Sequence, residues 1–481
     1  MTRILVLAAM VAICSSAQEK TAVGLASDQT VLEAILPPPS TLPRILLVGG
    51  LDGDSAAAKT LRQQVKVSKR YSVAAIPLAN PSRRKLIFPP PGDAYRDHPE
   101  SHALWRWIGT YAPDLVLIVG DGAGLAEALS RERVAGVGRI PANRVTGRLK
   151  IPAPPKSEAR LEMESRLART PRQVAEQAAQ VYGHELNEPV YIPAVALMGR
   201  LHLGQQTDVE RIVQPYVIGA KNSLEKPTSS HFSGHLLFAE LAERTKNPRY
   251  VELVRAAANM GFTSSGEMRE SMPMHSRMSD SVFMGCPILV KAGKLTGETK
   301  YYDMALRHFR FMKKLDQRPD GLWRHSPADE TAWGRGNAFA LLGMALSLSD
   351  LPPSHPAYEE ILLAYRTLAS ALAKQQEEMG MWRQVVDKSG AYRELTATCM
   401  IGASLLRGIR RGWLDEASYQ PRVKRAWEAV KGRVASDGGL IDVCEGTGAQ
   451  KSLNDYLKRK AILGQDGRGG AMVLLFATEM E

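Results

Sequence analysis

The chain has 481 residues, of which 44% are hydrophobic and 23% are charged, as in globular domains that bury a real core. This length predicts two or three domains. Its 62 basic residues outnumber the 50 acidic ones, giving a net charge of +12. The excess is spread along the chain, without the basic blocks or interleaved aromatic residues of a nucleic-acid binder, so we expect no nucleic-acid partner. A basic surface would attract an acidic polysaccharide, among other acidic polymers.

The first 17 residues have the pattern of a cleaved export signal. Arg3 supplies the positive charge, residues 4–13 a short apolar core, and residues 15–17 the small side chains of a cleavage site. The apolar core is too short to span a bilayer, and no later segment has 18 uncharged apolar residues. We expect an exported protein, periplasmic or extracellular, without an integral membrane segment. The sequence leaves its oligomeric state open.

Three cysteines follow the signal, namely Cys286, Cys399 and Cys444. They lie far apart, and no spacing is typical of zinc ligation. We predict buried free thiols that pack as small apolar residues. One disulfide with one thiol left over is the alternative. No metal site and no cofactor is predicted.

Residues 40–150 alternate strand-like and helix-like patterns. The expected elements are strands at 44–50, 72–77 and 114–119 and helices at 56–67 and 102–111. Continuous apolar runs of this length are typical of buried parallel strands. The alternation predicts an α/β domain with ligand sites at the carboxyl ends of its strands. The preceding residues 18–42, which end in a proline-rich segment, are expected to be irregular.

This front domain resembles the zinc carboxypeptidase family, including its deacylase-like branch, but without the metal ligands. Asp52 stands where the family motif has its ligand His, and Ser55 stands where it has its ligand Glu. The third ligand, a His after a later strand, is replaced by Gly120 and Asp121. Because zinc needs three or four ligands, we expect a degenerate domain without that chemistry. Asp52, Asp54 and Asp121 are expected to be solvated loop carboxylates.

Residues 151–170 read as a linker that runs into a helix, and long amphipathic patterns follow from residue 171 to residue 481. A turn followed by a Tyr and a helix recurs at Tyr250, Tyr301, Tyr358 and Tyr419. A repeat of more than 50 residues with two helices predicts stacked helical hairpins. About six hairpins would close into an (α/α)6 toroid, so the expected fold is mainly α with an α/β front domain. The loops at the inner-helix N-termini would line a funnel that commonly binds saccharides.

The stretch 275–337 collects the side chains expected of a sugar site. They are His275, Asp280, Trp323, His325, Trp333, Arg335 and Asn337. Indoles offer flat faces to pyranose rings, a carboxyl group transfers protons, and a guanidinium binds a uronate bidentately. Structural interpretations remain open for each of them. Asp280 could cap the helix expected near Val282, Asn337 could cap the next helix, Arg335 could form an internal ion pair, and both indoles could be core.

Residues from about 171 to 481 resemble glycoside hydrolase family 105, the unsaturated rhamnogalacturonyl and glucuronyl hydrolases, with kinship to family 88. The resemblance rests on four segments in the same order, 278–287, 321–325, 333–337 (Trp-Gly-Arg-Gly-Asn) and 392–398. It implies that Asp280 is the general acid and base, with its pKa raised by burial. It also implies substrate contacts by His275, Trp323, His325, Trp333, Arg335, Asn337, Glu394 and Thr398. Glu394 and Thr398 could equally be structural.

One departure from that family concerns a second Asp, expected just before the Gly of the first inner hairpin. The matching stretch 228–235 contains no carboxylate. His231 and His235 are the substitutes at hand and are included as substrate contacts. Without a substitute, the substrate differs or the activity is lost.

These observations give a leading hypothesis and two alternatives. The leading one is an exported glycoside hydrolase that hydrates the C4–C5 double bond of unsaturated uronyl oligosaccharides left by pectin or rhamnogalacturonan lyases. An alternative is a non-catalytic binding protein for acidic oligosaccharides. A third is a sugar epimerase, which would need a histidine pair that His275 and His325 do not clearly supply. The expected partner is in each case a saccharide.

Overall fold

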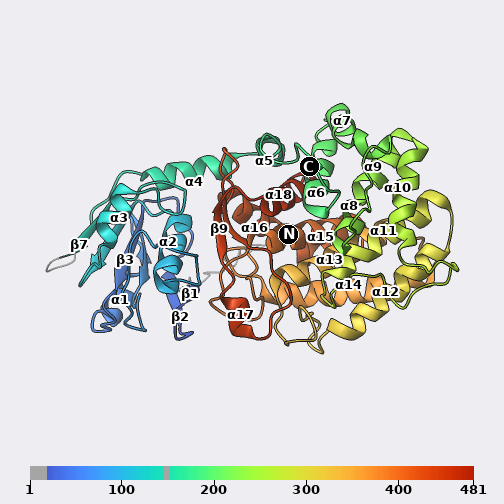
Figure 1. Cartoon of the computed structure of the whole chain (residues 1–481). Helices are drawn as coiled ribbons and strands as arrows, with labels where there is room; N and C mark the ends of the chain where they lie inside the picture. The colour runs from blue at the N-terminus through green and yellow to red at the C-terminus, as the bar shows by residue number, and fades with distance from the viewer. Residues whose placement is uncertain (1–18, 146–150) are drawn as a thin grey trace, which may run out of the picture.

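The computed structural model describes residues 19–145 and 151–481, so the predicted export signal and Cys14 lie outside the described residues. A sheet domain lies beside a larger helical domain, and the helix α4 (Glu158–Ala168) leads from one to the other (Figure 1). This helix lies within residues 151–170, the predicted linker. In the ranges that the structure describes, no helix is long and apolar enough to cross a membrane.

The front domain is a mixed sheet with strand order β1-β2-β5-β3-β6-β7, and β4 pairs with β5. Its strands are β1 (Glu19–Leu25), β2 (Val31–Leu36), β3 (Arg44–Gly49), β4 (Lys66–Val67), β5 (Ser72–Ile76), β6 (Leu115–Val119) and β7 (Ala142–Val145). Its helices are α1 (Ala58–Gln64), α2 (Pro99–Tyr111) and α3 (Leu125–Arg131). The strands β5, β3, β6 and β7 run parallel, as the apolar runs predicted. Asp52, Asp54 and Asp121 are exposed, and the described residues contain no His, Cys, Asp and Glu cluster that could hold a metal ion.

The prediction of an irregular leader at residues 18–42 is wrong. Residues 19–25 and 31–36 form the antiparallel pair β1–β2, which extends the sheet through β5. Pairing with an existing sheet satisfies the backbone groups of these strands, a tertiary effect that the local sequence does not announce. The proline-rich segment only marks where β2 ends.

The helical domain repeats pairs of long helices. Its elements are α5 (Pro171–Ala179), α6 (Tyr191–His202), α7 (Gln206–Val217), α8 (Ser229–Gly234), α9 (Leu236–Thr245), α10 (Pro248–Asn259), α11 (Ser281–Thr296), α12 (Lys300–Asp316), α13 (Gly334–Asp350), α14 (Pro356–Gln375), α15 (Leu395–Arg410), α16 (Glu416–Gly432), β8 (Leu440–Cys444), α17 (Leu453–Leu457), β9 (Ala461–Gly464) and α18 (Gly467–Glu479). The predicted hairpin repeat is confirmed, because Tyr250, Tyr301, Tyr358 and Tyr419 each lie in the first turn of α10, α12, α14 and α16.

The other helices of these pairs pack against one another in series. The helix α11 contacts α8 and α13, α13 contacts α15, α15 contacts α18, and α18 contacts α6, which contacts α8 again. The helices α11, α13 and α15 are buried over most of their length, whereas α10, α12 and α14 expose one face. The N-termini of the buried helices lie at one end of the series, where the loops predicted to carry the site also lie. The three described cysteines are free and buried, as predicted.

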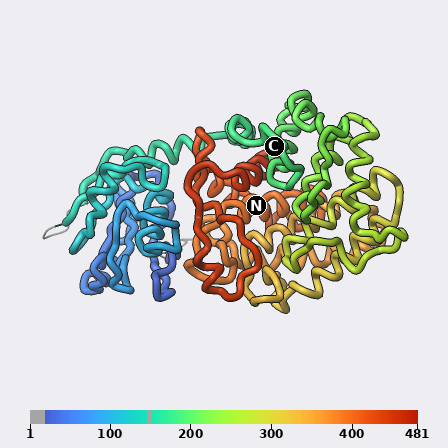
Figure 2. The backbone as a smooth tube through the Cα atoms, viewed as in Figure 1, coloured from blue at the N-terminus to red at the C-terminus, as the bar shows by residue number. Residues whose placement is uncertain are grey.

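The two domains share a buried interface next to those loops. The ring of Tyr95 stacks on Tyr392 at 4.5 Å between centroids and 7° between planes. The Tyr95 hydroxyl lies 3.3 Å from the carboxylate of Asp442, which also pairs with Arg106 at 3.3 Å. The guanidinium of Arg393 donates to the carbonyl of Ala22 on β1 at 2.9 Å. The C-terminal segment with α17 and β9, red in Figure 2, runs along this boundary.

Candidate active site

Asp280 occupies the N-cap position of α11, but its side chain makes no capping hydrogen bond. Its Oδ2 atom instead lies 3.1 Å from Nε2 of His325. The two atoms are within ion-pair distance without the alignment of a hydrogen bond, so both lack a hydrogen-bond partner among the described residues. A carboxylate that neither caps its helix nor accepts a hydrogen bond from a protein group is free to act on a substrate.

The imidazole of His325 is fully buried and contacts Tyr456 and Trp333. Its Nδ1 lies 2.8 Å from the hydroxyl of Tyr456, and its ring centroid lies 4.3 Å from that of Trp333. Burial raises the pKa of Tyr456 to about 12, so this hydroxyl keeps its proton. The Tyr456 oxygen also accepts from the backbone N–H of Gln450 at 3.1 Å, so the hydroxyl is fixed between Gln450 and His325.

Arg335 uses its guanidinium within the protein. Its two terminal nitrogens donate to the backbone carbonyls of Cys444 at 2.7 Å and Glu445 at 2.6 Å. The guanidinium lies 4.6 Å above the ring of Trp333. Arg335 is buried and ties the segment after β8 to the start of α13. The guanidinium is therefore used for internal contacts, as the ion-pair alternative proposed, rather than left free to bind a uronate. Its partners are backbone carbonyls and not a carboxylate.

Trp323, Trp333 and Asn337 form one buried unit. The two tryptophans are 0% and 1% exposed, so neither presents an open face to solvent. The amide of Asn337 accepts from the Trp323 N–H at 2.8 Å and donates to the carbonyls of Trp323 and Trp333 at 2.7 and 2.9 Å. Asn337 thereby holds both ends of the loop that carries His325.

Glu394 caps the N-terminus of α15, and Thr398 lies in the first turn of that helix. The carboxylate of Glu394 accepts from the N–H of Ala397, from the hydroxyl of Thr396 and from the N–H of Cys444. The hydroxyl of Thr398 donates to the Glu394 carbonyl at 2.8 Å and accepts from the N–H of Trp382 at 3.1 Å.

The three remaining histidines do not join Asp280 through any contact in the described structure. His231 accepts the N–H of Thr228 on its Nδ1 at 3.1 Å, which completes a capping box at α8. His235 is fully buried, with Nδ1 2.6 Å from the carbonyl of His231 and Nε2 2.9 Å from the Ser223 hydroxyl. Burial lowers the pKa of His235 to about 4, so the ring is neutral. His275 packs on Phe311 at 5.1 Å, and burial lowers its pKa.

Residues 174–481 match the model of Glycosyl Hydrolase Family 88, over more than half of the chain. The chain belongs to this family. It is 26% identical over 210 residues to the "Unsaturated rhamnogalacturonyl hydrolase YesR" of Bacillus subtilis, covering 42% of this chain and 59% of that protein. It is 29% identical over 181 residues to the "Unsaturated 3S-rhamnoglycuronyl hydrolase" of Formosa agariphila, covering 33% of this chain and 47% of that protein. The chain thus spans about half the length of these curated relatives.

Solved structures give the fold of this family 88 chain. A possible member of family GH105 from Klebsiella pneumoniae superposes with a TM-score of 0.55 at 20% identity, over 69% of this chain and 96% of that one. A possible GH105 member from Salmonella enterica gives 0.54 at 20% identity, over 69% and 97%. The predicted six-hairpin type of helical fold therefore fits residues 174–481, and the sheet domain precedes it.

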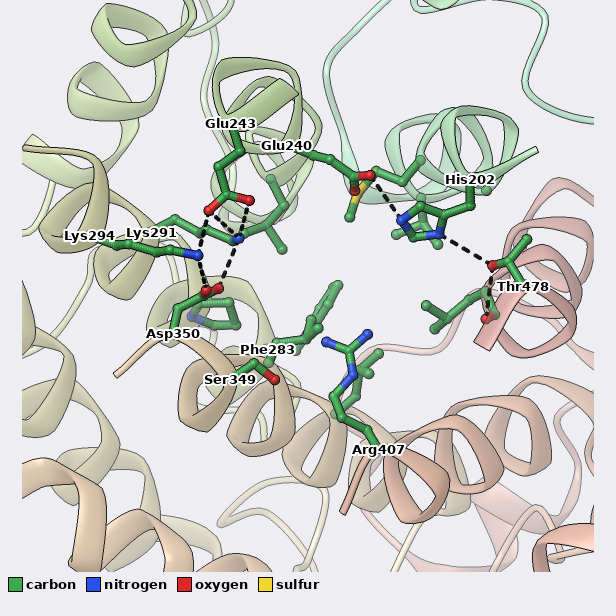
Figure 3. Close-up of a pocket in the computed structure, with 18 of the residues that line it drawn as sticks. His202, Glu240, Glu243, Phe283, Lys291, Lys294, Ser349, Asp350, Arg407 and Thr478 are labelled. Atoms are coloured by element: carbon green, nitrogen blue, oxygen red, sulfur yellow. Dashed lines mark hydrogen bonds and ion pairs between the residues drawn. The ribbon is translucent and has the colours of Figure 1, made fainter. Parts of the chain in front are cut away.

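A pocket of about 460 Å³ lies at the other end of the buried helices (Figure 3). Its rim carries charged side chains from the last turns of those helices, and they pair across helix boundaries. Lys291 of α11 bridges Glu243 of α9 at 2.9 Å and Asp350 of α13 at 2.8 Å. His202 of α6 lies 2.9 Å from Glu240 of α9. None of the site residues predicted from sequence lines this pocket. Its charged side chains form ion pairs between neighbouring helices.

Two buried polar residues outside the predicted set bear on this region. Tyr456 lies outside the four segments that carry the resemblance, yet its hydroxyl lies 2.8 Å from Nδ1 of His325. Asp316 was not noted at all, and its carboxyl group is fully buried at the end of α12. The sequence did contain a signal for Asp316, because a carboxylate is disfavoured at the C-terminal end of a helix.

Proposed function

We propose that this family 88 member hydrolyses unsaturated uronyl oligosaccharides, with Asp280 as general acid and base. The observation that carries the proposal is the uncommitted Asp280 carboxylate, 3.1 Å from the buried ring of His325. The names of the curated relatives, unsaturated rhamnogalacturonyl and 3S-rhamnoglycuronyl hydrolases, support the same substrate class. The pectin or rhamnogalacturonan origin of the substrate is part of the proposal.

The proposed reaction needs only one proton donor. The substrate is a vinyl ether, with a C4–C5 double bond beside the ring oxygen. Protonated Asp280 gives its proton to C4, and the π electrons form the new C4–H bond, leaving positive charge shared by C5 and the ring oxygen. Water adds at C5 and returns a proton to the Asp280 carboxylate, and the resulting hemiketal opens to release the aglycone. His325 lies close enough to orient the Asp280 carboxyl group through this cycle.

Four further parts of the proposal rest on sequence and arrangement. The closed series of buried helices supports an (α/α)6 toroid whose mouth holds Asp280. The front domain, extended to include β1 and β2, is proposed to derive from the carboxypeptidase-like fold. Export is proposed from the signal pattern of residues 1–17. Direct substrate contact is proposed for His275 and His325, whereas Trp323, Trp333, Arg335, Asn337, Glu394 and Thr398 are proposed to shape the site from behind.

The alternative of a non-catalytic oligosaccharide-binding protein has one observation in its favour. The segment 228–235 lacks a carboxylate, and His231 and His235 spend ring nitrogens on protein groups. If no other group supplies the missing carboxyl, binding without turnover would follow.

The test is turnover of oligosaccharides made by a pectin or rhamnogalacturonan lyase. Their conjugated double bond absorbs in the ultraviolet, and hydration removes that absorbance. The full chain should abolish the absorbance, and Asp280→Asn should not. Asp415→Asn is the matched control, because Asp415 also precedes a helix but caps it, with its carboxylate accepting from Ser418. Tight binding of the oligosaccharides without loss of absorbance would favour the alternative, and full activity of Asp280→Asn would refute the role of Asp280.

A further inference from the structure

One segment of the front domain carries a large share of the positive charge of the chain. Residues 55–92 contain eight basic residues and no acidic one, against a net charge of +12 for the whole chain. The expectation that the basic excess is spread along the chain is therefore wrong for this segment. The eight side chains, called the basic band below, are Lys59, Arg62, Lys66, Lys69, Arg70, Arg83, Arg84 and Lys85.

The charges of the basic band are not neutralised by partners within the protein. Seven of the eight residues are exposed, and Arg62 is half-buried. Across residues 19–145 and 151–481, none of the eight forms an ion pair or donates a side-chain hydrogen bond. The acidic residues that precede the band, Asp52 and Asp54, each accept a backbone N–H at 2.9 Å instead. Because unpaired like charges repel one another, an anionic partner would stabilise this surface.

A tight hairpin presents three of these cations. The strand β4, which contains Lys66, pairs antiparallel with β5. In the turn between the strands, the Ser68 hydroxyl donates to the carbonyl of Tyr71 at 2.8 Å. It also accepts from the N–H groups of Arg70 and Tyr71 at 3.2 and 3.0 Å. The turn is thus fixed from within, and it holds Lys69 and Arg70 in an ordered, exposed position.

The turn after β5 presents the other cluster of cations, residues 83–85. The side-chain amide of Asn80 donates to the carbonyl of Leu51 at 2.9 Å and to that of Arg84 at 2.8 Å, which ties this turn to the end of β3. A side chain at Gly53 would collide with the stem of Arg83, so the two loops are in contact. These cations therefore lie at the carboxyl ends of parallel strands, where ligands of α/β domains commonly bind.

The helix of the basic band lies on the face of the sheet that points away from the helical domain. Side chains of β3 alternate between the two faces, so Leu46 packs in the apolar cluster of α2, whereas Leu47 packs with Leu61 of α1. The α2 face meets the helical domain through the ion pair of Arg106 with Asp442. Figure 1 shows α2 next to the helical domain and α1 on the outer side. The basic band is therefore left open, apart from the candidate active site.

The chemistry of this surface fits an acidic polysaccharide better than other polyanions. Proteins that bind single-stranded nucleic acids stack bases on aromatic side chains, and the aromatic residues of this segment, Tyr71 and Phe88, are half-buried. Binding in a bilayer surface uses an apolar face, and Val67 is the one exposed large hydrophobic residue of residues 55–92, all of which the structure describes. The helical domain belongs to a glycoside hydrolase family, so a saccharide polymer is the matching anion.

We propose that the basic band makes the front domain a docking surface for acidic polysaccharides, chains of uronic acids whose carboxylates meet the free cations. The inference rests on the proposed function for the choice of a uronate polymer. Because the band faces away from the active site, it takes no part in the hydration step. It holds the enzyme on the polymer that a lyase is cutting, so the site meets the released oligosaccharides at a raised local concentration.

The first test measures binding of the full-length protein to polygalacturonate. The wild type should bind, with an affinity that falls as salt is raised, because salt screens exposed charges. The combined variant Lys66→Gln, Lys69→Gln and Arg70→Gln should bind about 100-fold more weakly, at roughly fivefold for each cation lost near an anionic surface.

A matched control removes the same charge elsewhere. The variant Lys314→Gln, Lys374→Gln and Lys424→Gln changes three exposed lysines of the outer helices α12, α14 and α16 and should keep the wild-type affinity. Fully methyl-esterified polygalacturonate has no charged carboxyl groups and should not bind. Equal affinity of the hairpin variant and the wild type, or binding of the methyl ester, overturns the proposal. Tighter binding to double-stranded DNA or to phosphatidylserine vesicles than to polygalacturonate also overturns it.

Turnover of short unsaturated oligosaccharides separates docking from catalysis. The hairpin variant should keep the wild-type kcat, because its substitutions lie away from the active site, and a lowered kcat would overturn this separation. If the wild-type chain turns over no unsaturated substrate, the proposed function fails. The polygalacturonate measurement then still decides whether the basic band is a docking surface.

Discussion

Replacing Asp316 by Asn should stabilise the protein by an amount that grows with pH. In the unfolded chain Asp316 releases its proton above its ordinary pKa of 3.8, whereas in the folded protein burial delays release to about pH 8. Between these values the folded state binds one more proton than the unfolded state, so its stability falls as pH rises. An uncharged Asn has no such dependence and nearly the same shape as the neutral acid.

The size of the effect follows from the pKa difference. Each pH unit above 3.8 costs the wild type about 1.4 kcal/mol, so Asp316→Asn gains about 4 kcal/mol at pH 7 and almost nothing at pH 4. Urea unfolding of both proteins at pH 4, 5, 6 and 7, with the fluorescence of the helical-domain tryptophans as the signal, measures this gain. Asp320→Asn, which removes an exposed carboxyl group that pairs with Arg318, should give no comparable gain. A gain for Asp316→Asn that stays constant or shrinks with pH would refute a neutral buried acid.

Three other substitutions test the support of the site. Tyr456→Phe removes the hydroxyl that hydrogen-bonds to Nδ1 of His325 and should lower kcat about tenfold, equivalent to roughly 1.4 kcal/mol, with an unchanged circular dichroism spectrum. An unchanged kcat would show that Tyr456 does not orient the ring. Asn337→Ala leaves the buried backbone N–H and carbonyl of Trp323 without their side-chain partner and should lower the free energy of unfolding by about 2–4 kcal/mol, whereas Asn454→Ala at an exposed position should not. Burial lowers the pKa of His235 to about 4, so the free energy of unfolding should fall by about 3 kcal/mol between pH 6.5 and pH 4. In His235→Asn this decrease should be smaller. A decrease equal to that of the wild type would exclude His235 as its source.

The architecture was predictable where a local pattern decides the structure. The parallel strands were predictable from their continuous apolar runs. The recurring tyrosines predicted the outer helices, because each tyrosine lies in the first turn of a helix that follows a loop. The pair β1–β2 was missed because its formation depends on an open edge at β5, which lies some forty residues further along the chain. Local propensity carries no information about such an edge.

The site was predictable at the level of segments rather than of side-chain roles. Asp280 and His325 do come together, although they are 45 residues apart in sequence. Arg335 has the residue type of a uronate clamp, but its donors are used by carbonyls of the segment after β8. Those carbonyls approach it only through the tertiary fold. Asp316 was overlooked because neither of its carboxyl oxygens has a hydrogen-bond partner among the described residues, and a missing hydrogen bond leaves no motif in a sequence.

The same contacts show why the front domain is more than an independent attachment. Its residues Ala94 and Tyr95 pack in one apolar cluster with Trp333, Tyr392 and Tyr456. Trp333 and Tyr456 are the groups that hold the ring of His325, and His325 faces Asp280. A displacement of the front domain would therefore expose the outer side of this wall and loosen the ring. The sheet domain thus forms part of the wall that supports the site of the helical domain.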